Sequence, residues 1–132
     1  MAVGIVLVSH SPALAGATAE VATALAGPDV TIAGAGGTDD GRMGTSIDLI
    51  QRAIMAADGG DGVVVIMDMG SSVLTAKTLL GVLEDDDDAP QVELADAPFV
   101  EGAVAAAVIA STGQDLAAVK AAAESGWAMR KL

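Results

Sequence analysis

Residues 3–12 read VGIVLVSHSP, an apolar run that ends abruptly in a polar turn. The run itself, residues 3–8, is rich in β-branched side chains and lacks the alternation of a half-exposed strand. Such a run is typical of a strand that is buried on both faces of a parallel sheet. Ser11 is a suitable N-cap, and Pro12 suits the first position of a helix. The stretch therefore predicts a central strand that leads through His10 directly into a helix.

The rest of the chain repeats this alternation of strand and helix. Residues 34–44 (GAGGTDDGRMG) are expected to form a glycine-rich loop, and Thr45 with Asp48 forms a weak capping box for the helix after it. The alternation predicts an α/β fold in one domain over residues 1–132: an open, doubly wound, mainly parallel sheet with strand order 2-1-3-4 and helices on both faces. Further strands are expected at residues 30–33, 63–67 and 92–94. Helices are expected after the Ser11 cap to about Leu25, from Thr45 to the turn at Gly59, after residues 68–72 to about Leu83, after the opening residues 96–98 to about Ser111, and from Leu116 to Glu124.

This topology brings His10 and Asp68 to one place. In an open parallel sheet, functional sites lie beyond the carboxyl ends of the strands, where the strand order reverses. In the order 2-1-3-4 that point lies between the first and third strands, which end just before His10 and Asp68. Neighbouring strands lie about 4.8 Å apart, so these two side chains are expected to meet although they are distant in sequence.

A histidine that is paired with a carboxylate beside a helix N-terminus suits phosphoryl transfer. The carboxylate fixes the proton on one ring nitrogen and leaves the other as a neutral nucleophile, while free N–H groups of the helix favour an anion. We therefore expect His10 to be the phosphorylated nucleophile and Asp68 to orient it. Ser11, Gly70 and Ser71 are expected to stabilise the phosphoryl group. The plainer alternatives are a histidine that only caps a strand and an aspartate that only ends one.

Composition narrows the class of function. Six Lys and Arg against 18 Asp and Glu give a formal net charge of -12, which opposes binding to nucleic acid or to an anionic membrane. No apolar run reaches 18 residues, so no membrane insertion is expected. The absence of Cys is compatible with a reducing compartment, and we expect a cytoplasmic protein.

Other chemistries match the sequence poorly. The glycine-rich loop lacks the Gly-Lys-Ser/Thr ending of a phosphate-binding loop, so it is expected to flank the site or contact a partner rather than bind nucleotide. One His and no Cys give little support for a metal site, and no cofactor is expected. Ser9, His10 and Asp68 do not fit a hydrolase triad, because Ser9 and His10 are adjacent and no Gly-x-Ser-x-Gly elbow exists.

Five short segments, spread over about the first hundred residues, occur in the same order as the motifs of one known protein family. They are VLVSHS at residues 6–11, Gly44-Thr45, MDMGS at residues 67–71, Thr75-Ala76, and APFVEG at residues 97–102. Together they resemble the phosphotransferase subunit of PEP-dependent dihydroxyacetone kinases, whose first domain is similar to the mannose-type IIA domains of the sugar phosphotransferase system. Ser72 stands where that family often has Ala, which leaves the site motif intact.

The resemblance implies a function and a set of partners. His10 matches the histidine that accepts a phosphoryl group from the histidine-containing phosphocarrier protein, and Asp68 matches the carboxylate paired with it. The group then passes to ADP on a separate ADP-binding kinase subunit, which phosphorylates dihydroxyacetone. The family also implies a homodimer with the site near the subunit interface.

Two alternatives stay open. One is a IIA component of a mannose-type sugar transporter, although transporter domains more often have Trp-Gly-Gly where this chain has MDMGS. The other is a regulatory module that binds partners through the same face without turnover.

Overall fold

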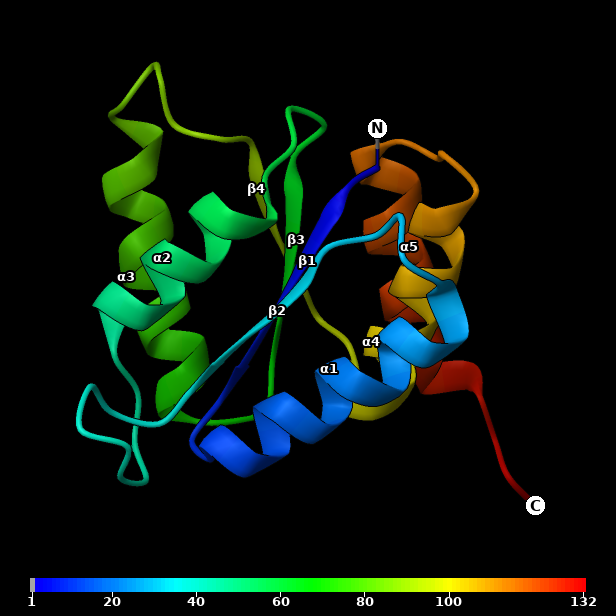
Figure 1. The fold of residues 1–132 in the computed structure, drawn as a ribbon, viewed down its shortest axis with the longest axis horizontal. Helices are drawn as coiled ribbons and strands as arrows, with labels where there is room; N and C mark the ends of the chain where they lie inside the picture. The colour runs from blue at the N-terminus through cyan, green and yellow to red at the C-terminus, as the bar shows by residue number, and fades with distance from the viewer. Residues whose placement is uncertain (1) are drawn as a thin grey trace.

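The computed structural model describes residues 2–132 as a four-stranded parallel sheet with helices on both faces (Figure 1). The strand order is β2-β1-β3-β4 and every neighbouring pair is parallel, which confirms the predicted α/β class and order. The elements are β1 (Gly4–Ser9), α1 (Pro12–Ala26), β2 (Ile32–Gly36), α2 (Ile47–Ala57), β3 (Val63–Met67), α3 (Ser71–Glu84), β4 (Val92–Ala95), α4 (Phe99–Ser111), α5 (Leu116–Glu124) and the short 3-10 helix η1 (Ser125–Ala128).

The central strand β1 is apolar throughout because helices cover both of its faces. Ile5 and Leu7 point to one side and Val6 and Val8 to the other, and all four are fully buried. Side chains alternate between the faces of a strand, so a continuous apolar run is what a doubly covered strand requires. The unbroken pattern of residues 3–8 is thereby explained.

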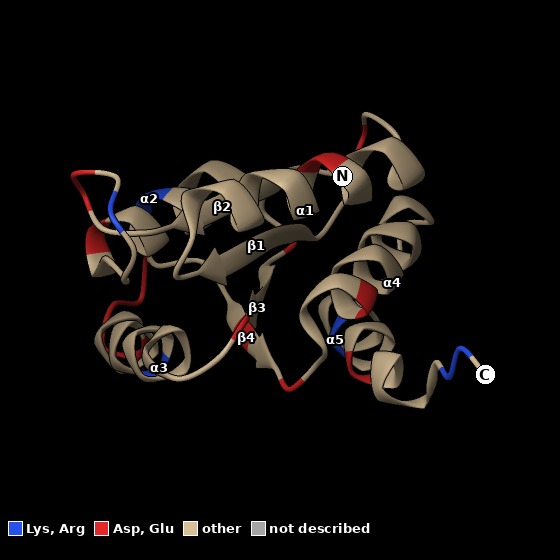
Figure 2. Ribbon diagram, turned by 90° about the horizontal axis from the view of Figure 1, so that it is seen from below, with Lys and Arg blue, Asp and Glu red and all other residues tan. Residues whose placement is uncertain are grey.

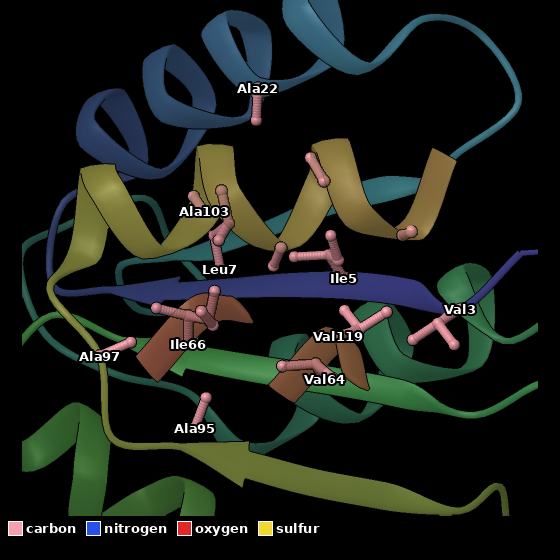
Figure 3. Packing of buried hydrophobic residues seen from close by; sticks show 14 of the residues in the cluster. Val3, Ile5, Leu7, Ala22, Val64, Ile66, Ala95, Ala97, Ala103 and Val119 are labelled. Carbon is pink, nitrogen blue, oxygen red and sulfur yellow. The ribbon is translucent and has the colours of Figure 1, made fainter. Parts of the chain in front are cut away.

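Alanines dominate the first core layer, in which α1, α4 and α5 pack on the sheet (Figure 3). The side chains of Ala103, Ala106, Ala107 and Ala110 on α4 are completely buried. Small side chains let α4 lie close to both the sheet and α1, whose Ala22 points toward it in Figure 3. The high alanine content thus serves close packing of helices on this face.

The opposite face is covered by α2 and α3, with larger aliphatic side chains. Ile50 and Ile54 of α2 and Leu79 and Leu83 of α3 are buried against the sheet. The spacing of Ile47, Ile50 and Ile54 predicts one apolar face, but Ile47 is more than one third exposed. The buried face of α2 therefore does not include its first residue.

Several element boundaries differ from those predicted. Strand β2 runs through Gly36, so the first part of the expected glycine-rich loop belongs to the sheet. Ser46 rather than Thr45 caps α2, because the Ser46 hydroxyl accepts from the Leu49 N–H. The 3-10 helix η1 was not predicted.

The connections that carry the candidate site lie at one end of the sheet. In Figure 1 the turns from β1 to α1, from β2 to α2 and from β3 to α3 gather at the lower edge. This arrangement follows from the parallel strands, whose carboxyl ends share an edge. Among the described residues, no helix combines the length and apolarity needed to cross a membrane.

Candidate functional site

His10 lies in the two-residue turn between β1 and α1. Its side chain is 26% exposed, so one edge of the ring reaches solvent while the other faces the protein. Ser11 begins α1: its hydroxyl accepts from the Leu14 N–H, and Pro12 occupies the first turn. The strand and the capped helix therefore fix the backbone on both sides of His10.

Asp68 is the acceptor around which the turn is organised. Its carboxylate lies 3.1 and 3.2 Å from Nδ1 of His10, and it accepts from the His10 N–H (3.1 Å), the Ser9 hydroxyl (3.0 Å) and the Met69 N–H (2.7 Å). The side chain is only 6% exposed. The predicted contact between His10 and Asp68 is thus present, and the carboxylate also holds the backbone that presents the histidine.

The carboxylate of Asp68 beside Nδ1 indicates which ring nitrogen carries the proton. Burial raises this pKa, but hydrogen bonds from Ser72, from the N–H and ring of His10 and from the Met69 N–H outweigh it and lower it from 3.8 to about 2. The carboxylate is therefore ionised at neutral pH and accepts a proton from Nδ1. This tautomer leaves the lone pair on Nε2.

The start of α3 lies against the imidazole ring. The Ser71 hydroxyl is 2.8 Å from Nε2, and the buried Ser72 hydroxyl is 3.2 Å from Nδ1. Gly70 has φ +52 at the N-cap position, in the left-handed region that glycine adopts readily, and no side chain caps the helix. Nε2 therefore lies beside a helix N-terminus, which favours negative charge.

Ser11 has a different position from the one expected of a phosphoryl-stabilising residue. Its hydroxyl caps α1, and its backbone N–H donates to the Ser9 hydroxyl at 3.0 Å. Both polar groups are thus engaged in building the turn, whereas the donor beside Nε2 comes from α3. The phosphoryl role of Ser11 stays a prediction.

The glycine-rich loop also supports the histidine turn. Gly44 N–H donates to the His10 carbonyl, and Gly37 N–H donates to the Ser9 carbonyl, each at 3.0 Å. At Gly36, a Cβ would lie 2.5 Å from the Ser11 carbonyl oxygen and 2.6 Å from Pro12 Cα. The loop therefore flanks the site as expected, and Gly36 at the end of β2 allows the close approach to the start of α1.

The sequence did not reveal the roles of Ser9 and Ser72. Ser9 belongs to no hydrolase triad; its hydroxyl donates to Asp68 and accepts from the Ser11 N–H, so it is a structural part of the turn. Ser72 is completely buried beside His10 and Asp68. A polar residue at the end of an apolar strand is the available indication for Ser9. The position of Ser72 next to Ser71 suggests an alternative donor to phosphoryl oxygens, whereas its hydroxyl lies at Nδ1.

The site offers a partly exposed histidine whose Nε2 lies at a helix N-terminus, an environment that favours an anion. Residues 2–132 contain no cluster of three metal-ligating side chains. Nucleophilic attack by Nε2 on a transferable group is the chemistry that this arrangement supports, and phosphoryl transfer depends mainly on positioning and charge stabilisation of this kind.

Comparison with known families agrees with this chemistry. A family model described as the PTS system fructose IIA component, EIIA-man, matches residues 4–120. A phosphoryl donor subunit DhaM of a PEP-dependent dihydroxyacetone kinase from Listeria innocua is 38% identical over 80% of this chain and 84% of its own length. The corresponding subunit from Escherichia coli is 40% identical over 86% of this chain, which spans only 25% of that longer protein.

Solved structures share the fold. A crystal structure described as that of a protein of unknown function is 35% identical, has a TM-score of 0.84, and aligns over 99% of this chain and 98% of its own. A sigma-54 interaction domain protein from Enterococcus faecalis, 16% identical with a TM-score of 0.66, shares the fold alone. From the family match and the curated relatives, the chain belongs to the EIIA-man family, in the group of the phosphoryl donor subunits of PEP-dependent dihydroxyacetone kinases.

Proposed function

We propose that this chain carries a phosphoryl group on Nε2 of His10 and donates it to a dihydroxyacetone kinase. The main support for the proposal is that the two nitrogens of the His10 ring have different partners. Nδ1 is hydrogen-bonded to Asp68, and Nε2 lies beside Ser71 at the start of α3. Curated relatives with this much similarity are named as phosphoryl donor subunits, which supports the direction of transfer.

The donor step moves the phosphoryl group between two nitrogens. Nε2 attacks the phosphorus of a phosphohistidine on the histidine-containing phosphocarrier protein, so a P–N bond forms here as another breaks there. The proton on Nδ1 remains in its bond with Asp68. Ser71 and the N-terminus of α3 offset the negative charge that the group brings toward the carboxylate.

The acceptor step returns the nitrogen to its starting state. A terminal phosphate oxygen of ADP, held on a separate ADP-binding kinase subunit, attacks the phosphorus, and the P–N bond to Nε2 breaks. The exposed edge of the ring permits this approach from solvent. The chain would need to position the group but not to bind the nucleotide itself.

The chain is also proposed to act as a homodimer. The outer face of α4 and η1 forms an apolar groove that includes Val104, Val108 and Met129. Glu101, the one charged residue of α4, is paired with Lys131 at 2.6 Å. Two chains of formal net charge -12 repel one another, so a face with little charge is where two copies can approach.

Incubation with PEP, enzyme I and the phosphocarrier protein, followed by intact mass measurement, tests the carrier role. We expect an acid-labile gain of one phosphoryl group in the wild-type chain and none in His10→Ala. Persistent absence of the gain in the wild type would contradict the proposal and favour a regulatory binding module.

A second transfer separates the kinase role from sugar transport. The family model is described as a fructose IIA component, so a transporter subunit is the competing acceptor. The phosphorylated chain is mixed with the ADP-loaded kinase subunit plus dihydroxyacetone, or with membranes that contain a mannose-type transporter plus sugar. We expect rapid loss of the phosphoryl group only in the first mixture; loss only in the second would assign the chain to transport.

A further inference from the structure

Three hydroxyl groups from two separate segments form a hydrogen-bonded series that ends on Nε2 of His10. The Ser71 hydroxyl lies 2.8 Å from Nε2, the Thr45 hydroxyl lies 3.4 Å from Ser71, and the Thr75 hydroxyl lies 3.0 Å from Thr45. Thr45 follows the glycine-rich loop, whereas Ser71 and Thr75 lie one turn apart on α3. The three hydroxyl groups therefore link the end of the glycine-rich loop to α3, the helix that faces Nε2.

The hydrogen bonds between these three hydroxyl groups can run in only one direction, from Thr75 toward His10. Because Nδ1 donates to ionised Asp68, Nε2 is an acceptor and Ser71 must donate its only proton to it. Ser71 can then only accept from Thr45, which is the donor in that contact. Thr45 has no further proton to give, so Thr75 donates to Thr45.

Capping of α2 does not explain the position of the Thr45 hydroxyl. The side chain that accepts from the first turn of α2 is Ser46, which follows Thr45 and bonds Leu49 N–H. Thr45 is partly buried and turns away from that helix toward α3. Its hydroxyl is thus available to act on Ser71.

We propose that Thr45, supported by Thr75, is a positioning residue that holds the Ser71 hydroxyl as a donor toward Nε2 and, after phosphorylation, toward a phosphoryl oxygen. The inference rests on the proposed carrier function and extends it to two residues outside the histidine turn. The 3.4 Å contact between Thr45 and Ser71 is long for a pair of hydroxyls. Hydrogen bonds at catalytic sites are often long before the substrate is bound and tighten in the reacting complex.

Removing the hydroxyl while keeping the side-chain shape tests the proposal. Thr45→Val is expected to slow phosphoryl transfer from the phosphocarrier protein roughly 3- to 10-fold, the effect of one neutral hydrogen bond. Thr45→Ser restores a hydroxyl and is expected to restore most of the rate. Thr78→Val is the matched control, because within residues 2–132 the Thr78 hydroxyl bonds only the Leu74 carbonyl on the same helix. This variant is expected to transfer at the wild-type rate.

A double-mutant cycle identifies the route of the effect. If Thr45 acts through Ser71, Thr45→Val has no further effect in a Ser71→Ala background. Thr75→Val provides the same test at the far end of the hydroxyl series. It is expected to reduce the transfer rate less than Thr45→Val does, and to have no effect in the Ser71→Ala background. Equal losses in both backgrounds, or a Thr45→Ser variant as slow as Thr45→Val, would overturn the proposal.

A measurement on the unphosphorylated protein keeps this inference separate from the carrier function. The ¹⁵N resonance of Nε2 reports the hydrogen bond from Ser71 without any transfer reaction. We expect Thr45→Val to move this resonance toward its position in Ser71→Ala, and Thr78→Val to leave it unchanged. An unmoved resonance in Thr45→Val contradicts the positioning role, whereas a wild-type chain that never becomes phosphorylated contradicts only the carrier function.

Discussion

At the scale of single residues, Asp68 does more than orient the histidine. The position of Asp68 at a strand end predicts that Asp68→Ala leaves the fold nearly intact. The structure shows a carboxylate that is almost fully buried and accepts from the Ser9 hydroxyl and from two backbone N–H groups as well as from the ring. The same atoms thus stabilise the turn and prepare the nucleophile.

Asp68→Ala is therefore expected to lower both transfer and stability. Phosphoryl transfer should fall by about 10²-fold or more, because the ring loses its orientation and its tautomer bias. The donors left without an acceptor should reduce the free energy of unfolding by about 1–3 kcal/mol. Transfer assays and urea unfolding measure the two effects; an unchanged rate with unchanged stability would make Asp68 only a turn residue.

The low pKa of Asp68 also predicts an acid-dependent contribution to stability. The folded-state pKa of about 2 lies below the ordinary 3.8, so between these values the unfolded chain binds more protons. The contribution is therefore complete above about pH 5 and is lost progressively as the pH falls toward 2. Urea unfolding of wild type and Asp68→Asn should show a stability difference that is constant above about pH 5 and shrinks below it. A difference that does not change with pH would contradict the assigned hydrogen bonds.

At the scale of elements, the apolar runs were predictable and the polar details were not. Strand β3 and helix α5 have the predicted boundaries because a β-branched run and a turn-bounded helical segment are local properties. The end of β2 was missed because its sequence, IAGAG, has the composition of the loop that follows it. The cap of α2 was misplaced because Thr45 and Ser46 are both suitable caps, and only the tertiary contact of Thr45 with α3 separates them.

The same limit applies to the candidate site. The pairing of His10 with Asp68 followed from strand order, because parallel neighbours bring their carboxyl ends together. The roles of Ser9, Ser72 and Thr45 depend on side-chain directions that a one-dimensional pattern does not contain. Topology can therefore place a site before the structure is known, but not its supporting hydrogen bonds.

Close packing between β2 and the start of α1 leads to a prediction at this scale. Gly36→Ala is expected to destabilise the protein by about 1–3 kcal/mol, because the added methyl group collides with the Ser11–Pro12 backbone. The displaced helix start should also slow phosphorylation of His10. The matched control is Gly16→Ala, in the exposed interior of α1, where a Cβ meets no atom within 4 Å. In thermal unfolding, Gly16→Ala should raise the free energy of unfolding by about 0.5–1 kcal/mol. Equal effects of the two substitutions would contradict the steric explanation.

At the scale of the whole molecule, charge and apolar surface are distributed unequally. Figure 2 shows acidic residues concentrated in loops and helix ends, whereas the ribbon of α4 is almost entirely uncharged. Exposed apolar side chains are ordinary on a folded protein, but a groove that combines several of them is a candidate interface. Because the whole chain is strongly negative, a face with so little charge is one where a second copy would meet little repulsion.

The proposed dimer can be tested by placing a charge on that face. Val108 lies on α4 in the apolar groove and is 40% exposed, so Val108→Glu should not disturb the core of the monomer. In a two-fold dimer each substitution enters the interface twice, so two buried like charges would oppose association. Val82→Glu is the matched control, since Val82 is 59% exposed on α3, which covers the opposite face of the sheet. Light scattering at micromolar concentration should give a dimer mass for the wild type and for Val82→Glu, and a monomer mass for Val108→Glu. A dimeric Val108→Glu would move the interface away from α4, whereas a monomeric wild type would remove the dimer itself.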